Sequence, residues 1–358
     1  MQQDTTPPTA MDTERARIRA AAAEAPPARE RDLAARIGVS EAALLAAHAG
    51  EAGSPWQVTP IVATSDRLMP VAQALGEVMA LTRTRSCVHE RVGRYEDWHQ
   101  GDHASMVLGA EIDLRIFPKF WAHAYAVEKD GRRSLQVFDA AGDAVHKIFL
   151  REGSDLATFE AAKEALAIDA PFPDFAEREA PEPARGNPDK TEVLRREWGR
   201  LTDTHQFLLL CRKLKMNRLG ANRLAGAPFA RQLTPGAAAE ALQRLAGGAL
   251  PVMIFVGNRG CIQIHSGPVT RVEPMGPWLN VLDDRFNLHL RTDHVAEVWA
   301  IEKPTKRGPA RSLEAFDADG GLIFQIFGFR QQDGADHSEA WGALLDDLPT
   351  AKTAEDVA

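Results

Sequence analysis

Residues 133–142 read RSLQVFDAAG, and 178 positions further on residues 311–320 read RSLEAFDADG. Each copy alternates apolar and polar side chains and ends in a glycine-containing turn, which is typical of a β-strand that leads into a tight turn. The match identifies an internal repeat, and a repeat constrains the architecture more strongly than any single element does.

The repeat extends toward the N-terminus of each copy. Residues 86–94, SCVHERVGR, align with residues 260–268, GCIQIHSGP, at an offset of 174, and residues 111–117, EIDLRIF, lie over residues 285–291, RFNLHLR. An insertion at the turn Pro304-Thr305-Lys306-Arg307 explains why the offset later increases by four. Because the period has the size of a domain, it argues against a solenoid and predicts two copies of one module.

Each copy begins with helical patterns and continues with strand patterns. Apolar spacing predicts helices within residues 12–48, where Ser40 is a good N-cap, and over about 203–215 and 217–225. Short alternating runs predict strands over residues 252–256, 261–265, 286–290, 296–301, 312–316 and 322–327. We therefore predict an α+β fold, a tandem duplication of a module with N-terminal helices followed by a large antiparallel β-sheet.

Proline content defines the domain boundaries. Five prolines among acidic residues mark residues 171–190 as the linker between the copies. We expect the first repeat over residues 28–170 and the second over residues 191–346. Residues 1–27 and 347–358 are expected to be a flexible N-terminal segment and a flexible tail.

Composition limits the class of protein. The chain has 358 residues, 50 acidic and 42 basic, with a net charge of −8 and 44% hydrophobic residues. It can bury a sizeable core, and its acidity argues against nucleic acid as a partner. No apolar run approaches the roughly 18 to 20 residues that cross a bilayer, and the N-terminus does not read as an export signal. Three cysteines without a CxxC pair favour a reducing cytoplasm, so we expect a cytoplasmic protein that is not membrane-embedded.

The sharpest local signal is the start of a helix at residues 201–207, LTDTHQF. Asp203 as N-cap and Gln206 three residues later resemble a capping box, which would place His205 in the first turn. The positive end of a helix disfavours imidazolium, so a neutral ring nitrogen would be available to a metal. A histidine that only covers an exposed helix start gives the same pattern, and spacing alone favours that bland interpretation.

A second candidate lies on the strand over residues 112–117. Period-2 alternation sends its aliphatic side chains to one face and Arg115 and Phe117 to the other, where they would face a ligand cleft. A salt bridge from Arg115 to Asp113 or Glu111 is the alternative, and from the residues alone it is the better one.

Aromatic and cationic residues also alternate at the end of the second copy. Residues 322–330 place Phe324 and Arg330 on one face of a strand. A flat ring beside a cation suits a planar anionic ligand, although the same pattern is common in ordinary sheets.

Taken together, residues 203–207, 257–267, 111–117 and 312–317 resemble the bacterial haemin-degrading factor family, the cytoplasmic haem-utilisation proteins of the HemS, HmuS and ChuS type. The resemblance covers about residues 28–346 and includes the duplication. It implies one non-covalent haem b per chain, bound in the second repeat against the interface between the copies. Such a ligand needs an axial nitrogen, apolar walls and cations at its rim.

The resemblance also implies residue roles. The family's axial histidine maps onto His205, and its distal arginine maps onto Arg115, with Phe117 nearby. His289 stands where the second copy would have the equivalent of Arg115. The residues that would hold the propionates and the porphyrin rim are Arg218, Lys303, Phe324, Gln325 and Arg330, and the family often has tyrosine where this chain has phenylalanine.

The implied function is haem binding in an iron-acquisition pathway. The protein would carry imported haem to a haem oxygenase, or would itself degrade haem with an external reductant and O2, Arg115 acting on the distal side. The implied partners are haem, a haem oxygenase and an inner-membrane haem importer. Two alternatives stay open: a zinc-dependent enzyme that uses His89, His99 and His103, and a duplicated scaffold without a ligand.

Overall fold

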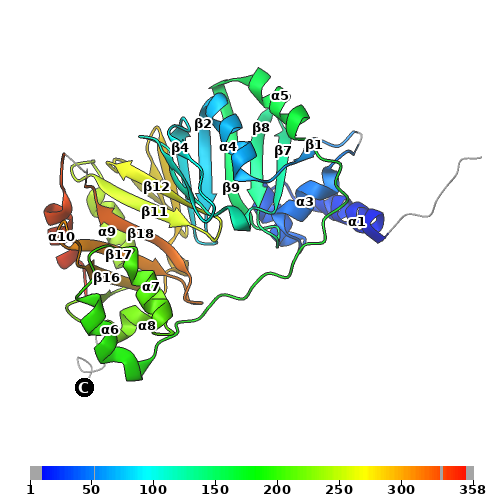
Figure 1. Cartoon of the computed structure of the whole chain (residues 1–358). Coiled ribbons are helices and arrows are strands. Elements are labelled where there is room, and N and C mark those ends of the chain that lie inside the picture. Colours follow the sequence, from blue (N-terminus) through cyan, green and yellow to red (C-terminus); the bar gives the residue numbers. More distant parts are fainter. Residues whose placement is uncertain (1–9, 52, 331–333, 352–358) are drawn as a thin grey trace, which may run out of the picture. The chain divides into compact units, whose positions relative to one another are not determined.

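The computed structural model describes residues 10–51, 53–330 and 334–351 (Figure 1). The chain divides into two compact units, which do not coincide with the two halves of the sequence. Unit 1 comprises residues 1–82, 91–178 and 258–262, and unit 2 comprises residues 83–90, 179–257 and 263–358. Each unit therefore includes a short segment from the other half of the chain.

Unit 1 contains a layer of antiparallel strands and helices on both of its faces. Its helices are α1 (Ala10–Glu24), α2 (Glu30–Arg36), α3 (Glu41–His48), α4 (Ser65–Ala74), η1 (Pro118–Phe120) and α5 (Leu156–Leu166). Its strands are β1 (Trp56–Ile61), β2 (Gly76–Arg83), β4 (Trp98–His99), β5 (Ser105–Leu108), β6 (Asp113–Ile116), β7 (His123–Lys129), β8 (Arg132–Phe138) and β9 (Ala144–Ser154). The larger group of strands has the order β1-β7-β8-β9-β2.

Unit 2 repeats this arrangement with the order β10-β16-β17-β18-β11. Its helices are η2 (Pro188–Lys190), α6 (Thr191–Trp198), α7 (Gln206–Lys213), α8 (Arg218–Ala225), α9 (Ala237–Leu245), η3 (Thr292–His294) and α10 (Ser338–Asp346). Its strands are β10 (Ala230–Leu233), β11 (Val252–Gly257), β13 (Val272–Met275), β14 (Trp278–Leu282), β15 (Phe286–Arg291), β16 (Glu297–Lys303), β17 (Ala310–Phe316) and β18 (Leu322–Gly328). Strands β3 (Cys87–Gly93) and β12 (Cys261–Gly267) are each divided between the two units.

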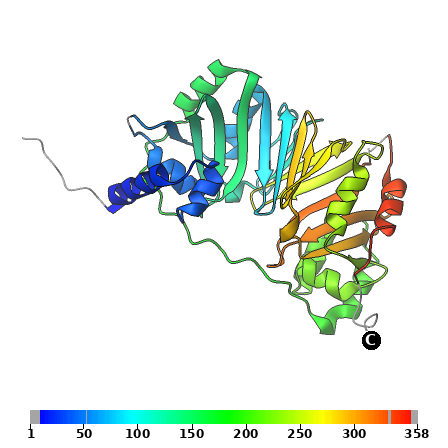
Figure 2. The same ribbon diagram turned by 180° about the vertical axis from the view of Figure 1, so that it is seen from behind.

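Helices cover both faces of each sheet. Because successive strand residues point to opposite sides, neighbouring residues of one strand pack into different cores. In β7, Ala124 pairs with the core under α4 and α5, whereas Tyr125 packs with α1, α2 and α3. In β16, Val298 joins the core under α9 and α10, whereas Trp299 packs with α6, α7 and α8. Figures 1 and 2 show these helices from opposite sides. The predicted α+β duplication is confirmed, and the strands predicted for the second copy are found with ends shifted by at most two residues.

The repeated stretch forms the same turn in both units. Asp139 Oδ1 accepts hydrogen bonds from two backbone N–H groups, those of Ala141 and Asp143, and Asp317 does the same for Asp319 and Gly321. The glycines at positions 142 and 320 have φ of +81° and +88°, which an L side chain adopts only with strain. The aspartate and the glycine of the repeat are thus both required by one turn.

The insertion predicted in the second copy lies between β16 and β17. The first copy joins β7 to β8 through Asp130 and Gly131 alone, whereas the second uses residues 304–309. The four additional residues form a longer turn, and Lys306 N in this turn donates a hydrogen bond to the carbonyl of Thr202.

Helix α1 lies within the segment predicted to be flexible. Ile18 is buried, and the guanidinium groups of Arg15 and Arg19 donate hydrogen bonds to the carbonyls of Ala49 and Ala47. The amphipathic docking of α1 onto α3 explains why the segment from Ala10 is ordered as a helix. Residues 1–9, and residues 352–358 of the predicted tail, lie outside the described residues.

The turn between β11 and β12 completes unit 1. Asn258 Oδ1 accepts hydrogen bonds from the N–H groups of Gly260 and Cys261, and the Gly260 carbonyl accepts hydrogen bonds from Phe117 N and Trp121 Nε1 at 3.0 and 3.1 Å. A Cβ atom at position 260 would lie 2.5 Å from Val145 Cγ1, so only glycine fits. Residues 258–262 thus belong to the second copy in sequence and to the core of unit 1 in the structure.

Candidate functional site

His205 lies immediately before α7, at the N-cap position of the helix. The prediction that Asp203 is the N-cap is wrong, because the helix begins at Gln206 and residues 203–206 form a preceding turn. The Gln206 side chain does reach back, but it accepts a hydrogen bond from Thr202 N at 2.9 Å. The helix start predicted from these residues is therefore present, two residues later than expected.

Asp203 orients the imidazole of His205 instead of capping the helix. Its Oδ1 accepts hydrogen bonds from His205 N at 2.8 Å and from His205 Nδ1 at 2.7 Å. These two bonds, with a smaller contribution from Lys306, hold the pKa of Asp203 below its usual value. With Nδ1 engaged, Nε2 is the remaining ring nitrogen, and the side chain is 94% exposed. A carboxylate on one ring nitrogen is the usual support of a metal-binding histidine.

Apolar and cationic groups lie on the segments next to His205 in unit 2. Leu208 and Leu209, one turn further along α7, are 41% and 62% exposed, which is high for leucine. The inserted turn after β16 reaches the same loop, since Lys306 N donates to the Thr202 carbonyl at 3.1 Å. Arg330 donates a hydrogen bond to the carbonyl of Arg307 in that turn and also pairs with Asp336. The structure thus connects Arg330 to the His205 loop through the insertion.

Three of the predicted rim residues converge on one buried carboxylate. Glu314 has no exposed surface and accepts hydrogen bonds from Arg218 at 2.8 Å, Lys303 at 3.0 Å and Gln325 at 2.8 Å. Asn222 adds a fourth bond at 3.2 Å. Burial by itself raises the pKa of Glu314, but Arg218 and Lys303 outweigh it and lower the pKa to about 2. The cluster is therefore ionised and internally paired, and its role at a ligand rim remains a prediction.

Phe324 lies in the hydrophobic core of unit 2. Its side chain is 1% exposed and belongs to the cluster under α9 and α10, on the opposite face of the sheet from Gln325. The alternation of β18 explains this placement. Phe324 and Arg330 are not on one continuous strand either, because β18 ends at Gly328.

Arg115 and Phe117 belong to unit 1, at the end of β6 and just after it. The aliphatic residues of this strand are fully buried, as the alternation predicts. Arg115 forms the ion pair with Asp113 that the sequence offered as an alternative. Burial raises the pKa of Asp113, and Arg115 opposes that shift. The distal role of Arg115 remains a prediction.

The zinc alternative finds no support in the described residues. No group of three or more His, Cys, Asp or Glu side chains among them could hold a metal ion. His89 is fully buried against Phe286, whereas His99 is half exposed and pairs with Asp97 at 2.9 Å. His99 and His103 therefore do not form a ligand set, because the segment between them is a surface loop.

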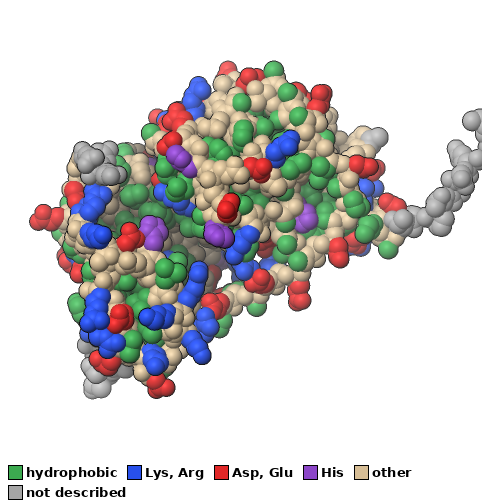
Figure 3. Space-filling view, viewed as in Figure 1, with side chains coloured by type: hydrophobic (Ala, Val, Ile, Leu, Met, Phe, Trp, Pro, Cys, Tyr) green, Lys and Arg blue, Asp and Glu red, His purple; other side chains and the backbone are tan. Residues whose placement is uncertain are grey.

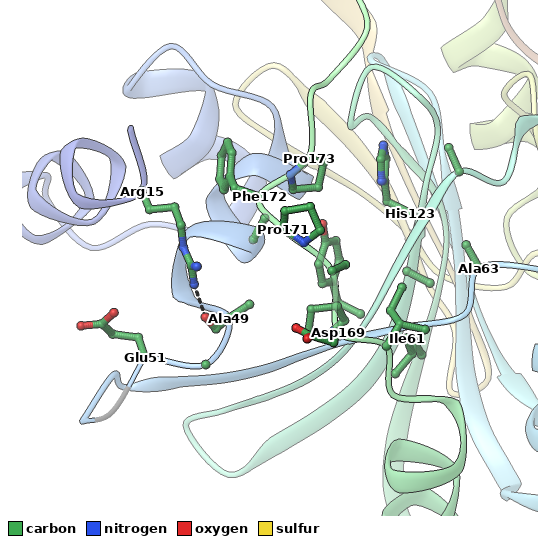
Figure 4. Close-up of a pocket in the computed structure, with 18 of the residues that line it drawn as sticks. Arg15, Ala49, Glu51, Ile61, Ala63, His123, Asp169, Pro171, Phe172 and Pro173 are labelled. Carbon is green, nitrogen blue, oxygen red and sulfur yellow. Dashed lines mark hydrogen bonds between the residues drawn. The ribbon is translucent and has the colours of Figure 1, made fainter. Parts of the chain in front are cut away.

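A cavity of about 470 Å³ lies in unit 1, between α1, the end of α3 and the segment that follows α5 (Figure 4). Its apolar surface includes Ile61, Pro171 and Phe172. Arg15, on its edge, already donates to the Ala49 carbonyl, as the dashed line in Figure 4 shows. None of the residues predicted to bind haem lines this cavity.

The comparisons with known proteins agree with this duplicated architecture. A model of the haemin-degrading HemS.ChuX domain matches residues 38–166 and 215–348, one segment in each copy. The chain belongs to this family. It is 36% identical over 327 residues to the hemin transport protein HmuS of Yersinia pestis, which covers 90% of this chain and 93% of that protein.

Solved structures extend the family match to the whole fold. The haem-binding protein PhuS of Pseudomonas aeruginosa, solved without and with its ligand, matches with a TM-score of 0.87 and 37% identity over 96% of this chain and 100% of PhuS. The heme degrading enzyme ChuS of Escherichia coli O157:H7 matches with a TM-score of 0.84 and 29% identity over 95% of this chain and 99% of ChuS. No helix among the described residues of this family member is long and apolar enough to span a membrane.

Sequence reasoning missed two groups near His205. Lys306 was treated only as part of an insertion, although its cation lies close enough to Asp203 to help lower the pKa of that carboxyl. The exposed Leu208 and Leu209 were assigned no role, although the periodicity of a helix over these residues already places residues 205, 208 and 209 on one face.

Proposed function

We propose that this protein binds haem through His205 and acts in haem uptake and iron acquisition. The observation that carries the proposal is the Asp203–His205 pair, which fixes Nδ1 as the nitrogen that faces the carboxylate and leaves Nε2 exposed. Family membership supports the ligand, since relatives are described as hemin transport and haem-binding proteins.

The residues around His205 suit a flat dicarboxylate. Exposed Leu208 and Leu209 offer apolar contact beside the ring, and Lys306 and Arg330 offer cations on the inserted turn and next to it. Haem would supply an iron atom that accepts the Nε2 lone pair. We infer a non-covalent b-type haem, because the chain has no CxxCH motif.

Bound haem would either be transferred to another protein or be degraded, and the two fates require different groups at the site. Transfer to a haem oxygenase requires only reversible binding at His205. Degradation further requires a donor on the other side of the ligand, the role that we assign to Arg115. We place the protein in the cytoplasm, where it would receive haem from an inner-membrane importer; its three cysteines, all buried and unpaired, suit that compartment.

Haemin titration tests the binding step. We expect a saturable Soret shift with one haemin per chain, which His205→Ala abolishes. His99→Ala is the matched control, because His99 is also an exposed histidine paired with an aspartate two residues away. An unchanged Soret shift in His205→Ala, or its loss in His99→Ala alone, contradicts the proposed ligand.

An absorbance time course of the haem complex with reductant, oxygen and catalase tests the outcome. Loss of the Soret band in the wild type, slowed in Arg115→Gln, identifies degradation. Persistence of the band assigns the protein to transfer, and a subsequent transfer of the band to an added haem oxygenase would complete that assignment.

A further inference from the structure

A second cleft lies in unit 2, at the C-terminal end of α7. It has a volume of about 450 Å³ and is bordered by the end of α7, the turn into α8, the turn after β17 and residues 181–185 of the linker. We propose that this cleft is a binding site for a small hydrophobic carboxylate, which it would bind without using His205. Its volume lies in the range of about 300 to 1,000 Å³ that is usual for small-molecule sites.

The cleft combines apolar walls with an excess of positive charge. Met216, Leu219, Phe316 and Leu322 line it together with the Cys211 thiol. Burial is the main reason that the pKa of Cys211 is raised to about 11, so the thiol is protonated at neutral pH and behaves as an apolar group. These walls fit a flat or branched hydrocarbon body.

Three guanidinium groups and one carboxylate line the same cleft. Arg185 is paired with Glu182 at 2.8 Å, and Arg218 is held by Glu314 below the cleft. Arg212 is exposed and forms no ion pair with any residue that the structure describes. Figure 3 shows Lys and Arg side chains gathered over the helices α6 to α8. Because an arginine fork matches a carboxylate in geometry, Arg212 is the group that we assign to the ligand's anion.

The internal repeat shows what the equivalent position holds in unit 1. The turn from α2 to α3 matches the turn from α7 to α8: Val39 N donates to the Ala34 carbonyl as Met216 N does to that of Cys211. In unit 1, two linker rings, Phe172 and Phe175, pack against this part of the core.

In unit 2, the linker contributes only Ala184 to the equivalent core. The backbone of residues 182–184 passes the turn glycine Gly320, and Phe175 lies against its counterpart Gly142. Unit 2 therefore has the same helix–turn–helix and linker arrangement without the two phenylalanine rings. The cleft lies beside the linker backbone at this position. A ligand with an aromatic body would occupy the kind of space that side chains fill in unit 1.

The cleft and His205 lie at opposite ends of α7. The helix extends from Gln206 to Lys213, which corresponds to roughly 11 Å along its axis. Neither His205 nor Lys306 nor Arg330 lines the cleft, whereas Leu208 and Arg218, which are assigned to the surroundings of the haem, do line it. Occupation of the cleft is thus expected to leave the Nε2 atom of His205 accessible.

Calorimetric titration of the full-length protein with 2-naphthoate tests the proposal, and 2-naphthamide serves as the neutral isostere. We expect saturable binding of one naphthoate and binding of the amide that is weaker by roughly tenfold or more, since a charged hydrogen bond is lost. Arg212→Gln should weaken naphthoate binding by a similar factor. Lys213→Gln is the matched control, because it removes the same charge from the neighbouring exposed position, which does not line the cleft.

A cleft-filling variant provides an independent arm. Leu322→Trp should abolish naphthoate binding by occupying the apolar wall, while its circular dichroism spectrum and its haemin Soret shift stay those of the wild type. His205→Ala should bind naphthoate normally, so that failure of the haem proposal and failure of this one are distinguishable. Absence of saturable naphthoate binding, or equal affinity in Arg212→Gln and wild type, would overturn the inference.

Discussion

Replacing Glu314 with glutamine should destabilise unit 2 severely. The Glu314→Gln change keeps the shape of the side chain but removes the carboxylate that pairs with Lys303, whose side chain is 3% exposed. It also leaves Arg218 with a neutral partner. The variant therefore retains two cations in a buried cluster without their counter-charge.

The magnitude follows from the burial and from the pKa. Breaking one side of a buried ion pair costs roughly 3 to 5 kcal/mol. The depressed pKa gives a similar figure, because a carboxyl group that moves from 4.5 to about 2 on folding favours the ionised folded state by about 3 kcal/mol. For a unit of this size, such a loss lowers Tm by roughly 6 to 20 °C.

Thermal and urea unfolding, followed by hydrogen exchange of peptides from β16 to β18, measures the effect where it should occur. The double variant Glu314→Gln/Lys303→Met also removes the more deeply buried of the two cations and should recover part of the loss. Glu240→Gln, at a surface pair with Arg244, is the control and should leave Tm unchanged. A Glu314→Gln protein within about 1 kcal/mol of wild type, or a double variant less stable than the single one, would refute the reasoning.

Three further predictions follow from other parts of the molecule. Asp203→Asn should weaken haemin binding by roughly 10- to 100-fold without abolishing it, because the amide no longer fixes the ring of His205, and a normal haemin affinity in this variant would exclude the orienting role. His146, fully buried between Tyr95 and Thr82, has its pKa lowered to about 3 by burial, so its contribution to stability is present above pH 6.5 and is lost as the pH falls toward 3. Unfolding of unit 1 measured across this range should therefore show up to about 5 kcal/mol of pH-dependent destabilisation, and a flat profile would contradict the neutral buried imidazole. Gly260→Ala should cost roughly 1 to 3 kcal/mol through the contact with Val145, whereas Gly153→Ala, which meets no atom within 4 Å, should be nearly neutral in the same unfolding assay.

The sequence predicted the elements that local chemistry determines. The turn built on Asp317 and Gly320, the helix that Ser40 caps and the strands of the second copy were all found near their expected positions. In each case one or two side chains bond to backbone groups nearby in the sequence, so the signal is contained in a short window.

Contacts between distant positions were beyond that kind of reasoning. Arg218, Lys303 and Gln325, which the resemblance assigns to a ligand rim, all bond to Glu314, and the role of this carboxylate was not predicted because strand periodicity gives no reason to bury an acid. The docking of α1 was missed for a related reason. Its ordering depends on guanidinium groups that bond to carbonyls more than 25 positions away in the sequence.

The way the two units share the turns at residues 83–90 and 258–262 bears on how such a molecule arises and how it is best dissected. A polypeptide cut within the linker would yield two fragments, each lacking a piece of its own core and displaying a piece of the other. A single module of this kind would complete its core by exchanging these segments with a second copy, and the extent of that exchange would depend on protein concentration. When both modules are in one chain, the exchange is intramolecular and no longer depends on concentration.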